Sequence, residues 1–87
     1  MYEHELRYRL VELGANKLGS MLSEFKAKNY EAAHYYKGGF QALKEAASSL
    51  FGIEPNSFRS QCMFELTCLR LDAQAGNMYE QNFTDEE

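Results

Sequence analysis

Apolar residues recur along most of this chain at the spacing of amphipathic α-helices. The most regular stretch spans residues 30 to 51, where successive apolar positions are separated by 3, 4, 3, 4 and 3 residues. This spacing places the side chains on one stripe of a helix, the seam expected of a bundle helix. Asn29 is a plausible N-cap, and Gly52 a left-handed C-cap. The stripe consists of Ala33, Tyr36, Phe40, Leu43, Ala47 and Leu50.

A second amphipathic segment covers residues 2–28. Its apolar residues fall within an arc of about 140° around a helix axis, with polar residues opposite. Gly14 lies on that arc, which predicts that another helix approaches closely there, whereas Gly19 has no evident role. The apolar arc consists of Leu10, Val11, Gly14, Ala15, Leu18, Met21, Leu22 and Phe25.

The third predicted helix, residues 55–81, is apolar on two opposite sides. A helix with this distribution is normally covered by neighbours on both sides, and two other helices cannot supply that cover alone. We therefore expect the second stripe to meet a second copy or a protein partner. One stripe contains Phe64, Cys68, Leu71, Ala75 and Met78, at 4, 3, 4, 3 spacing. The other, assigned to the partner or oligomer interface, contains Cys62, Leu66, Leu69 and Ala73.

The scarcity of strand-forming residues supports an all-α fold. The β-branched residues are only Val11, Ile53, Thr67 and Thr84. We predict a three-helix bundle, or a helical hairpin with a third helix packed on both faces. Residues 1–83 should form one domain with helices over 2–28, 30–51 and 55–81, and residues 84–87 an acidic, disordered tail. The glycine doublet at 38–39 favours a kink or a break in the second helix.

Composition and charge narrow the class of protein. Apolar residues make up 45% of the chain and charged residues 25%, as in ordinary soluble domains. The net charge of −4 argues against nucleic acid and anionic membrane surfaces as partners. No apolar run is long enough for a membrane span, and no secretory leader is evident. We expect a cytoplasmic protein.

The cysteines and histidines show no pattern typical of a reactive site. Cys62 and Cys68 are separated by roughly 9 Å of helix rise and point in different directions, so they should be reduced thiols. Neither these thiols nor His4 and His34 have the short spacing of a zinc site. Without a matched acid, base and nucleophile, we predict no catalytic residues, no metal, no cofactor and no enzymatic activity.

Aromatic residues form a candidate binding patch at the start of the second helix. Tyrosine and arginine are enriched at contact surfaces because both gain when desolvated. The same rings would serve equally well to cap the ends of a small core. With two arginines near the N-terminus, the patch comprises Tyr30, His34, Tyr35, Lys37, Arg7 and Arg9.

Two functions from different classes follow from these patterns. The first is a non-enzymatic interaction or assembly module, binding itself or a protein partner through the third helix. Small size alone suggests an accessory protein of a phage or mobile element. The second is an oligomer that binds an anionic metabolite or nucleotide in an interface pocket lined by tyrosine, lysine and arginine. A DNA-binding helix is disfavoured, because the third helix offers only Arg59 and Arg70 as cations.

Overall fold

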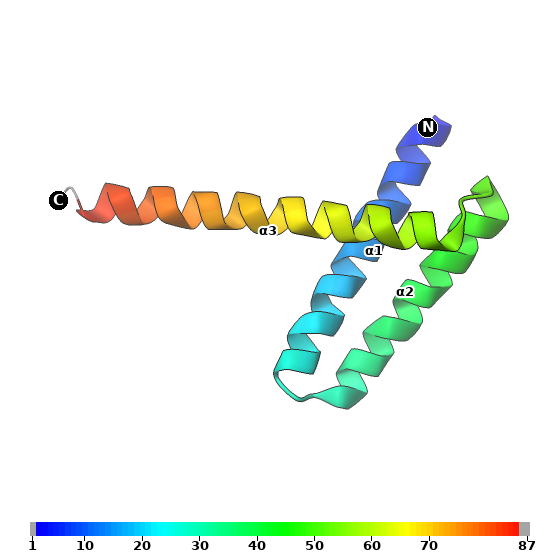
Figure 1. Cartoon of the computed structure of the whole chain (residues 1–87), viewed down its shortest axis with the longest axis horizontal. Helices are drawn as coiled ribbons and strands as arrows, with labels where there is room; N and C mark the ends of the chain where they lie inside the picture. Colours follow the sequence, from blue (N-terminus) through cyan, green and yellow to red (C-terminus); the bar gives the residue numbers. More distant parts are fainter. Residues whose placement is uncertain (1, 86–87) are drawn as a thin grey trace.

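Three packed helices make up the molecule. The computed structural model describes the backbone of residues 2–85 and the side chains of residues 2–73. The helices are α1 (Glu3–Lys26), α2 (Tyr30–Phe51) and α3 (Pro55–Asp85), and no strand occurs in the described range. α1 and α2 form an antiparallel hairpin, and α3 crosses one face of it and extends well beyond (Figure 1). The all-α prediction is confirmed.

The helix bounds follow the predicted ones closely, although α1 ends at Lys26, two residues before the predicted end. α2 has the predicted bounds and runs unbroken through the glycine doublet, so the kink favoured there does not form. The aliphatic stem of Lys17 covers Gly39, with its Cδ 3.3 Å from where a Cβ would stand. α3 continues past residue 81 to Asp85, into the predicted tail. The last two residues, 86–87, lie outside the described range.

Local capping explains where the helices begin and end. Gly52 has the predicted left-handed conformation, with φ at 66°. Asn29 stands at the N-cap of α2, but its side chain makes no capping hydrogen bond. At the start of α3, the Glu54 carboxylate accepts hydrogen bonds from the backbone N–H groups of Asn56 and Ser57 at 3.2 and 3.0 Å. These donors have no partner within the helix, so Glu54 acts as its N-cap.

A small apolar core joins the three helices. Between α2 and α3, the rings of Phe40 and Phe58 stack with their centroids 5.9 Å apart. Most of the predicted apolar positions of α1 and α2 are buried or half-buried, while Phe25 and Leu50 are exposed at the ends of the hairpin. The core cluster comprises Val11, Ala15, Leu18, Phe40, Ala47, Phe58, Cys62 and Leu66.

Two glycines of α1 allow α3 to lie close. A Cβ at Gly14 would stand 2.5 Å from Cys62 Sγ and 3.2 Å from Phe58 Cζ, which is too close for ordinary packing. The close approach predicted at Gly14 is therefore confirmed. Gly19 has a related role that its position outside the apolar arc did not indicate, since a Cβ there would stand 3.1 Å from Leu66 Cδ1.

Candidate interaction surface on the third helix

The inner face of α3 packs on the hairpin. This face is formed by Phe58, Cys62 and Leu66, of which the first two are fully buried and Leu66 is 7% exposed. Cys62 and Leu66 were assigned from the sequence to an interface with a partner. The structure corrects that assignment, because both side chains are held in the chain's own core above Gly14 and Gly19. Phe58, which anchors this face, was missed, although it lies one helical turn before Cys62.

The other two residues of the predicted interface, Leu69 and Ala73, are exposed. They follow Leu66 on the same side of α3, and Leu69 has 44% of its surface in solvent. α3 leaves the edge of the hairpin at about this point and continues alone (Figure 1). The inner face therefore changes along its length from core to free surface.

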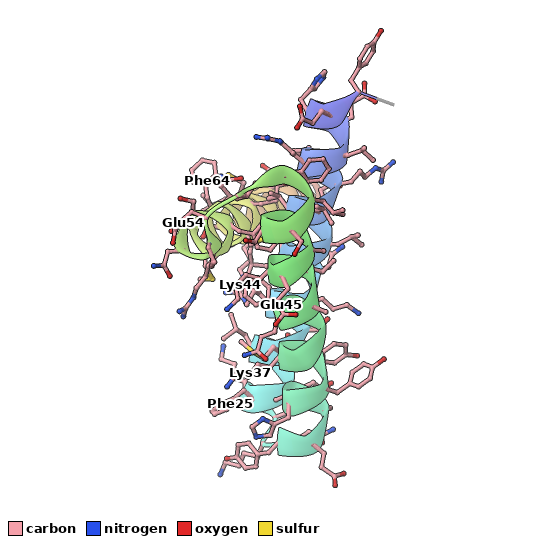
Figure 2. The ribbon with its side chains drawn as sticks, turned by 90° about the vertical axis from the view of Figure 1, so that its right-hand side faces the viewer. Phe25, Lys37, Lys44, Glu45, Glu54 and Phe64 are labelled. Carbon is pink, nitrogen blue, oxygen red and sulfur yellow. The ribbon has the colours of Figure 1, made fainter. Side chains whose placement is uncertain are left out.

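The outer face of α3 carries the second apolar stripe, which we call the outer seam: Phe64, Cys68 and Leu71. At 100° per residue, the seam lies about 200° around the axis from the inner face. Phe64 is 71% exposed and Leu71 is 59% exposed, while Cys68 is half-buried. Figure 2 shows Phe64 on the side of α3 that faces away from α2. Ala75 and Met78 continue the spacing, but their side chains lie outside the described residues.

A shallow groove of about 620 Å³ between α1 and α3 borders the outer seam. Its floor includes Val11, and Phe64 forms part of its wall. Tyr8 Oη donates a hydrogen bond to Glu65 Oε1 at 3.2 Å across the groove, and this contact with a carboxylate raises the pKa of Tyr8. The Arg7 guanidinium lies 5.6 Å from the ring centre of Phe51. Arg7 and Tyr8 of α1 thus lie beside the outer seam.

The candidate aromatic patch does not form one site within a chain. Tyr30 packs edge-on against Phe25 at the turn between α1 and α2. Arg7 lies at the opposite end of the hairpin, where it donates a hydrogen bond to the carbonyl of Phe51. The separation along α1 is about 27 Å, given the helix rise per residue. His34, Tyr35, Lys37 and Arg9 are exposed. Antiparallel pairing of α1 and α2 separates groups that the sequence pattern had combined.

The structure defines the state of the cysteines and of the potential metal ligands in the described range. Burial raises the pKa of the Cys62 thiol from 9.0 to about 11, so it carries no thiolate near neutral pH. Both cysteines are free. Within the described part of the chain, no group of three histidine, cysteine, aspartate or glutamate side chains is placed to hold a metal ion. The exposed apolar side chains of α3 are therefore the candidate site that we consider further.

Comparison with known proteins assigns neither a family nor a function to this chain. None of the protein-family models, curated proteins and solved structures compared with this chain matches it. Among the described residues, no helix combines the length and apolar character that crossing a membrane requires. The function must be inferred from the surface of the molecule.

Proposed function

We propose that this protein is a non-enzymatic assembly module that self-associates through α3. The observation that carries the proposal is the imbalance between the length of α3 and its packing. A helix of 31 residues is about 46 Å long. Among its described side chains, however, the buried ones end at Leu66. Leu69, beyond that residue, and Phe64 and Leu71 on the outer seam face solvent, while Cys68 of the seam is half-buried.

The overall dimensions support the proposal, because the chain is more extended and exposes more surface than a compact monomer of its size. Its radius of gyration is 15.9 Å, whereas a compact domain of this length has about 12 Å. Its accessible surface is 6694 Å², whereas a compact monomer of 10.0 kDa exposes about 5,200 Å². The difference of about 1,500 Å² exceeds the roughly 800 Å² that each partner contributes to a standard interface. One helix–helix contact along α3 would bury an area of the required size.

The spacing of the outer seam favours a second copy of the chain as its occupant. Intervals of 4, 3, 4, 3 match the heptad repeat of a two-stranded coiled coil. One flank of the seam is acidic, with Glu65 and Asp72, and the other carries the hydroxyls of Ser60 and Thr67. In a parallel pair, each acidic flank meets the hydroxyl flank of the partner. An antiparallel pair would place Glu65 opposite Asp72, and these like charges repel each other.

A parallel pair is also compatible with the position of the hairpins. The inner face, which holds the hairpin, lies on the opposite side of α3 from the outer seam. The two hairpins would therefore sit on the outside of the paired helices. Free cysteines suit a reducing compartment, and we place the assembly in the cytoplasm on that ground. A role in a phage or mobile element would rest on chain length alone.

Light scattering coupled to size exclusion tests self-association directly. We expect a mass of twice 10.0 kDa at micromolar concentration. Leu71→Glu should give a monomer with unchanged helix content, because Leu71 is exposed and contributes little to the core. Leu50→Glu is the matched control: Leu50 is 71% exposed but lies on α2, so its replacement should preserve the dimer. A wild-type chain that is monomeric at every concentration would contradict the proposal.

Crosslinking through Cys68 tests whether the α3 helices of the two chains run parallel. In a parallel pair the two Cys68 thiols face each other at one layer, so mild oxidation should give a disulfide-linked dimer. Cys68→Ser should abolish the crosslink and preserve the dimer mass. Cys62 is fully buried and should not substitute for it. A dimer that resists Leu71→Glu but dissociates with Leu69→Glu would transfer the contact to the exposed end of the inner face.

A further inference from the structure

Three cationic side chains surround an apolar pocket that all three helices build. The pocket holds about 270 Å³, and Lys37 and Lys44 of its lining lie on the other side of α3 from Phe64 (Figure 2). Leu18 and Met21 of α1 and Phe40 of α2 supply its apolar lining. Figure 2 shows Lys37 and Lys44 on the side of α2 where α3 crosses. The polar lining consists of Lys37, Gln41, Lys44 and Arg59.

The cations converge on the pocket from two helices. Lys37, Gln41 and Lys44 are spaced by four and three residues, so they share one face of α2, with the lysine Cα atoms about 10 Å apart. Arg59 lies across from them on α3. No carboxylate lines this pocket, and within the described part of the chain the salt bridge is the one between Arg7 and Glu3. A chain with net charge −4 thus concentrates positive charge at one cavity.

We propose that this pocket binds a small anionic amphiphile, specifically a monocarboxylate with a short apolar tail. The carboxylate would lie at the mouth between Arg59 and the two lysines, where guanidinium and ammonium groups donate charge-assisted hydrogen bonds. The tail would lie on Leu18, Met21 and Phe40. The cavity is just below the range of about 300–1,000 Å³ for drug-sized ligands, which favours a smaller ligand.

This site is independent of self-association through the outer seam. Lys37 is one of the six residues of the aromatic patch predicted from the sequence, and it is the member that the structure brings together with other cations around an apolar cavity. The tyrosines of that patch are not needed. The pocket lies within one chain, so a monomeric Leu71→Glu variant should bind the same ligand.

Titration with octanoate, followed by amide chemical shifts of the labelled protein, tests the site. We expect saturable shifts at Lys37, Gln41, Lys44 and Arg59, at concentrations below the micelle threshold. Octylammonium has the same tail with the opposite charge and should give no saturable shift. Acetate has the same head without the tail and should bind at least tenfold more weakly, because it buries no apolar chain in the pocket.

Arg59→Gln should weaken octanoate binding about fivefold, the effect expected of one exposed charge contact. Arg70→Gln is the matched control, since Arg70 is an exposed arginine of the same helix outside the pocket. An unchanged affinity in Arg59→Gln would overturn the proposal. Equal binding of octylammonium, or shifts that map to the groove beside Phe64 instead, would also overturn it.

Discussion

At the residue scale, Lys28 occupies a backbone conformation that suits glycine better than lysine. Its φ is 63°, the one positive value at a non-glycine residue in the described range. The Asn29 N–H donates to the Glu24 carbonyl at 2.9 Å and the Lys28 N–H to the Phe25 carbonyl at 3.1 Å. This is the hydrogen-bond pattern of a Schellman cap, in which the left-handed residue is usually glycine. The turn between α1 and α2 thus carries backbone strain.

Lys28→Gly should therefore raise stability. Relief of the left-handed strain, about 1–2 kcal/mol, exceeds the entropy that glycine adds to the unfolded chain, so we expect a net gain of about 0.5–1 kcal/mol. Urea unfolding followed by circular dichroism measures it. Lys28→Ala keeps the strain and should change stability by only a few tenths of a kcal/mol. Equal effects of the two substitutions would show that the lysine side chain, and not its backbone conformation, determines the outcome.

Because of Cys62, the folding stability should decrease as the pH becomes alkaline. The pKa of Cys62 is raised by burial from 9.0 to about 11, so the folded state keeps the thiol proton more tightly than the unfolded chain. The resulting stability is complete below pH 9 and is lost as the pH rises through 11. Cys62→Val should remove this component of the slope. The test is the difference between wild-type and variant urea midpoints from pH 8 to 11, which would stay constant if the thiol had no such role.

At the scale of elements, the seating of α3 on α1 depends on the absence of a side chain at Gly14. Gly14→Ala gains helix propensity of about 1 kcal/mol but forces a Cβ against Cys62 Sγ and Phe58, both fully buried. We expect a net loss of about 1–3 kcal/mol, the usual cost of overpacking. Differential scanning calorimetry should show a lower Tm.

Gly38→Ala should have the opposite effect and raise the stability of the protein. No atom lies within 4 Å of where its Cβ would stand, so the propensity gain of up to about 1 kcal/mol should be realised. In a second control, Gly14→Ala combined with Cys62→Ala removes the closer of the two clashes. The double substitution should cost less than the sum of the single ones. Strict additivity would contradict the close contact.

The start of α3 depends on the Glu54 carboxylate. Its hydrogen bonds from the N–H groups of Asn56 and Ser57 lower the pKa of Glu54 below 4.5. The stability from this cap is therefore present above pH 4.5 and is lost as the pH falls through the folded-state value. Glu54→Ala should lower the Tm at pH 7. In this variant the Tm should also decrease less steeply as the pH falls below 4.5. Glu45→Ala, which removes an exposed carboxylate on α2, should preserve both the Tm and the slope.

At this scale the sequence located the helices but did not assign every helix face correctly. α2 was located correctly at both ends because its stripe and its Gly52 cap are local features. The two apolar stripes of α3 were also recognised, but their roles were reversed at Cys62 and Leu66. Both stripes have a helical period and similar apolar content. Only the fit of Phe58 and Cys62 against Gly14 decides which of them faces inward.

At the scale of the whole molecule, the fold is a hairpin with a long arm. The extents of 54 × 35 × 20 Å reflect α3 projecting past the hairpin (Figure 1). The core that holds this arm is small, and the large side chains that are fully buried are Phe58 and Cys62. A molecule with so small a core should gain much of its stability from association.

Melting temperature should therefore depend on protein concentration. For a dimer that unfolds to separate chains, a tenfold increase in concentration should raise the Tm by about 3–6 °C. Leu71→Glu should melt at one temperature regardless of concentration, and Leu50→Glu should retain the dependence. Scanning fluorimetry over two decades of concentration suffices. A concentration-independent wild-type Tm would be incompatible with association through the outer seam.

The sequence by itself determined the helices, the Gly52 cap and the faces on which apolar residues lie. These properties depend on residues within about one helical turn of one another, so periodicity and capping residues reveal them. The tertiary structure decided which stripe of α3 is buried, separated Arg7 from Tyr30, and brought Lys37, Lys44 and Arg59 to one pocket. Those outcomes depend on how helices distant in sequence cross, and the crossing is set by side-chain fit that no local pattern encodes.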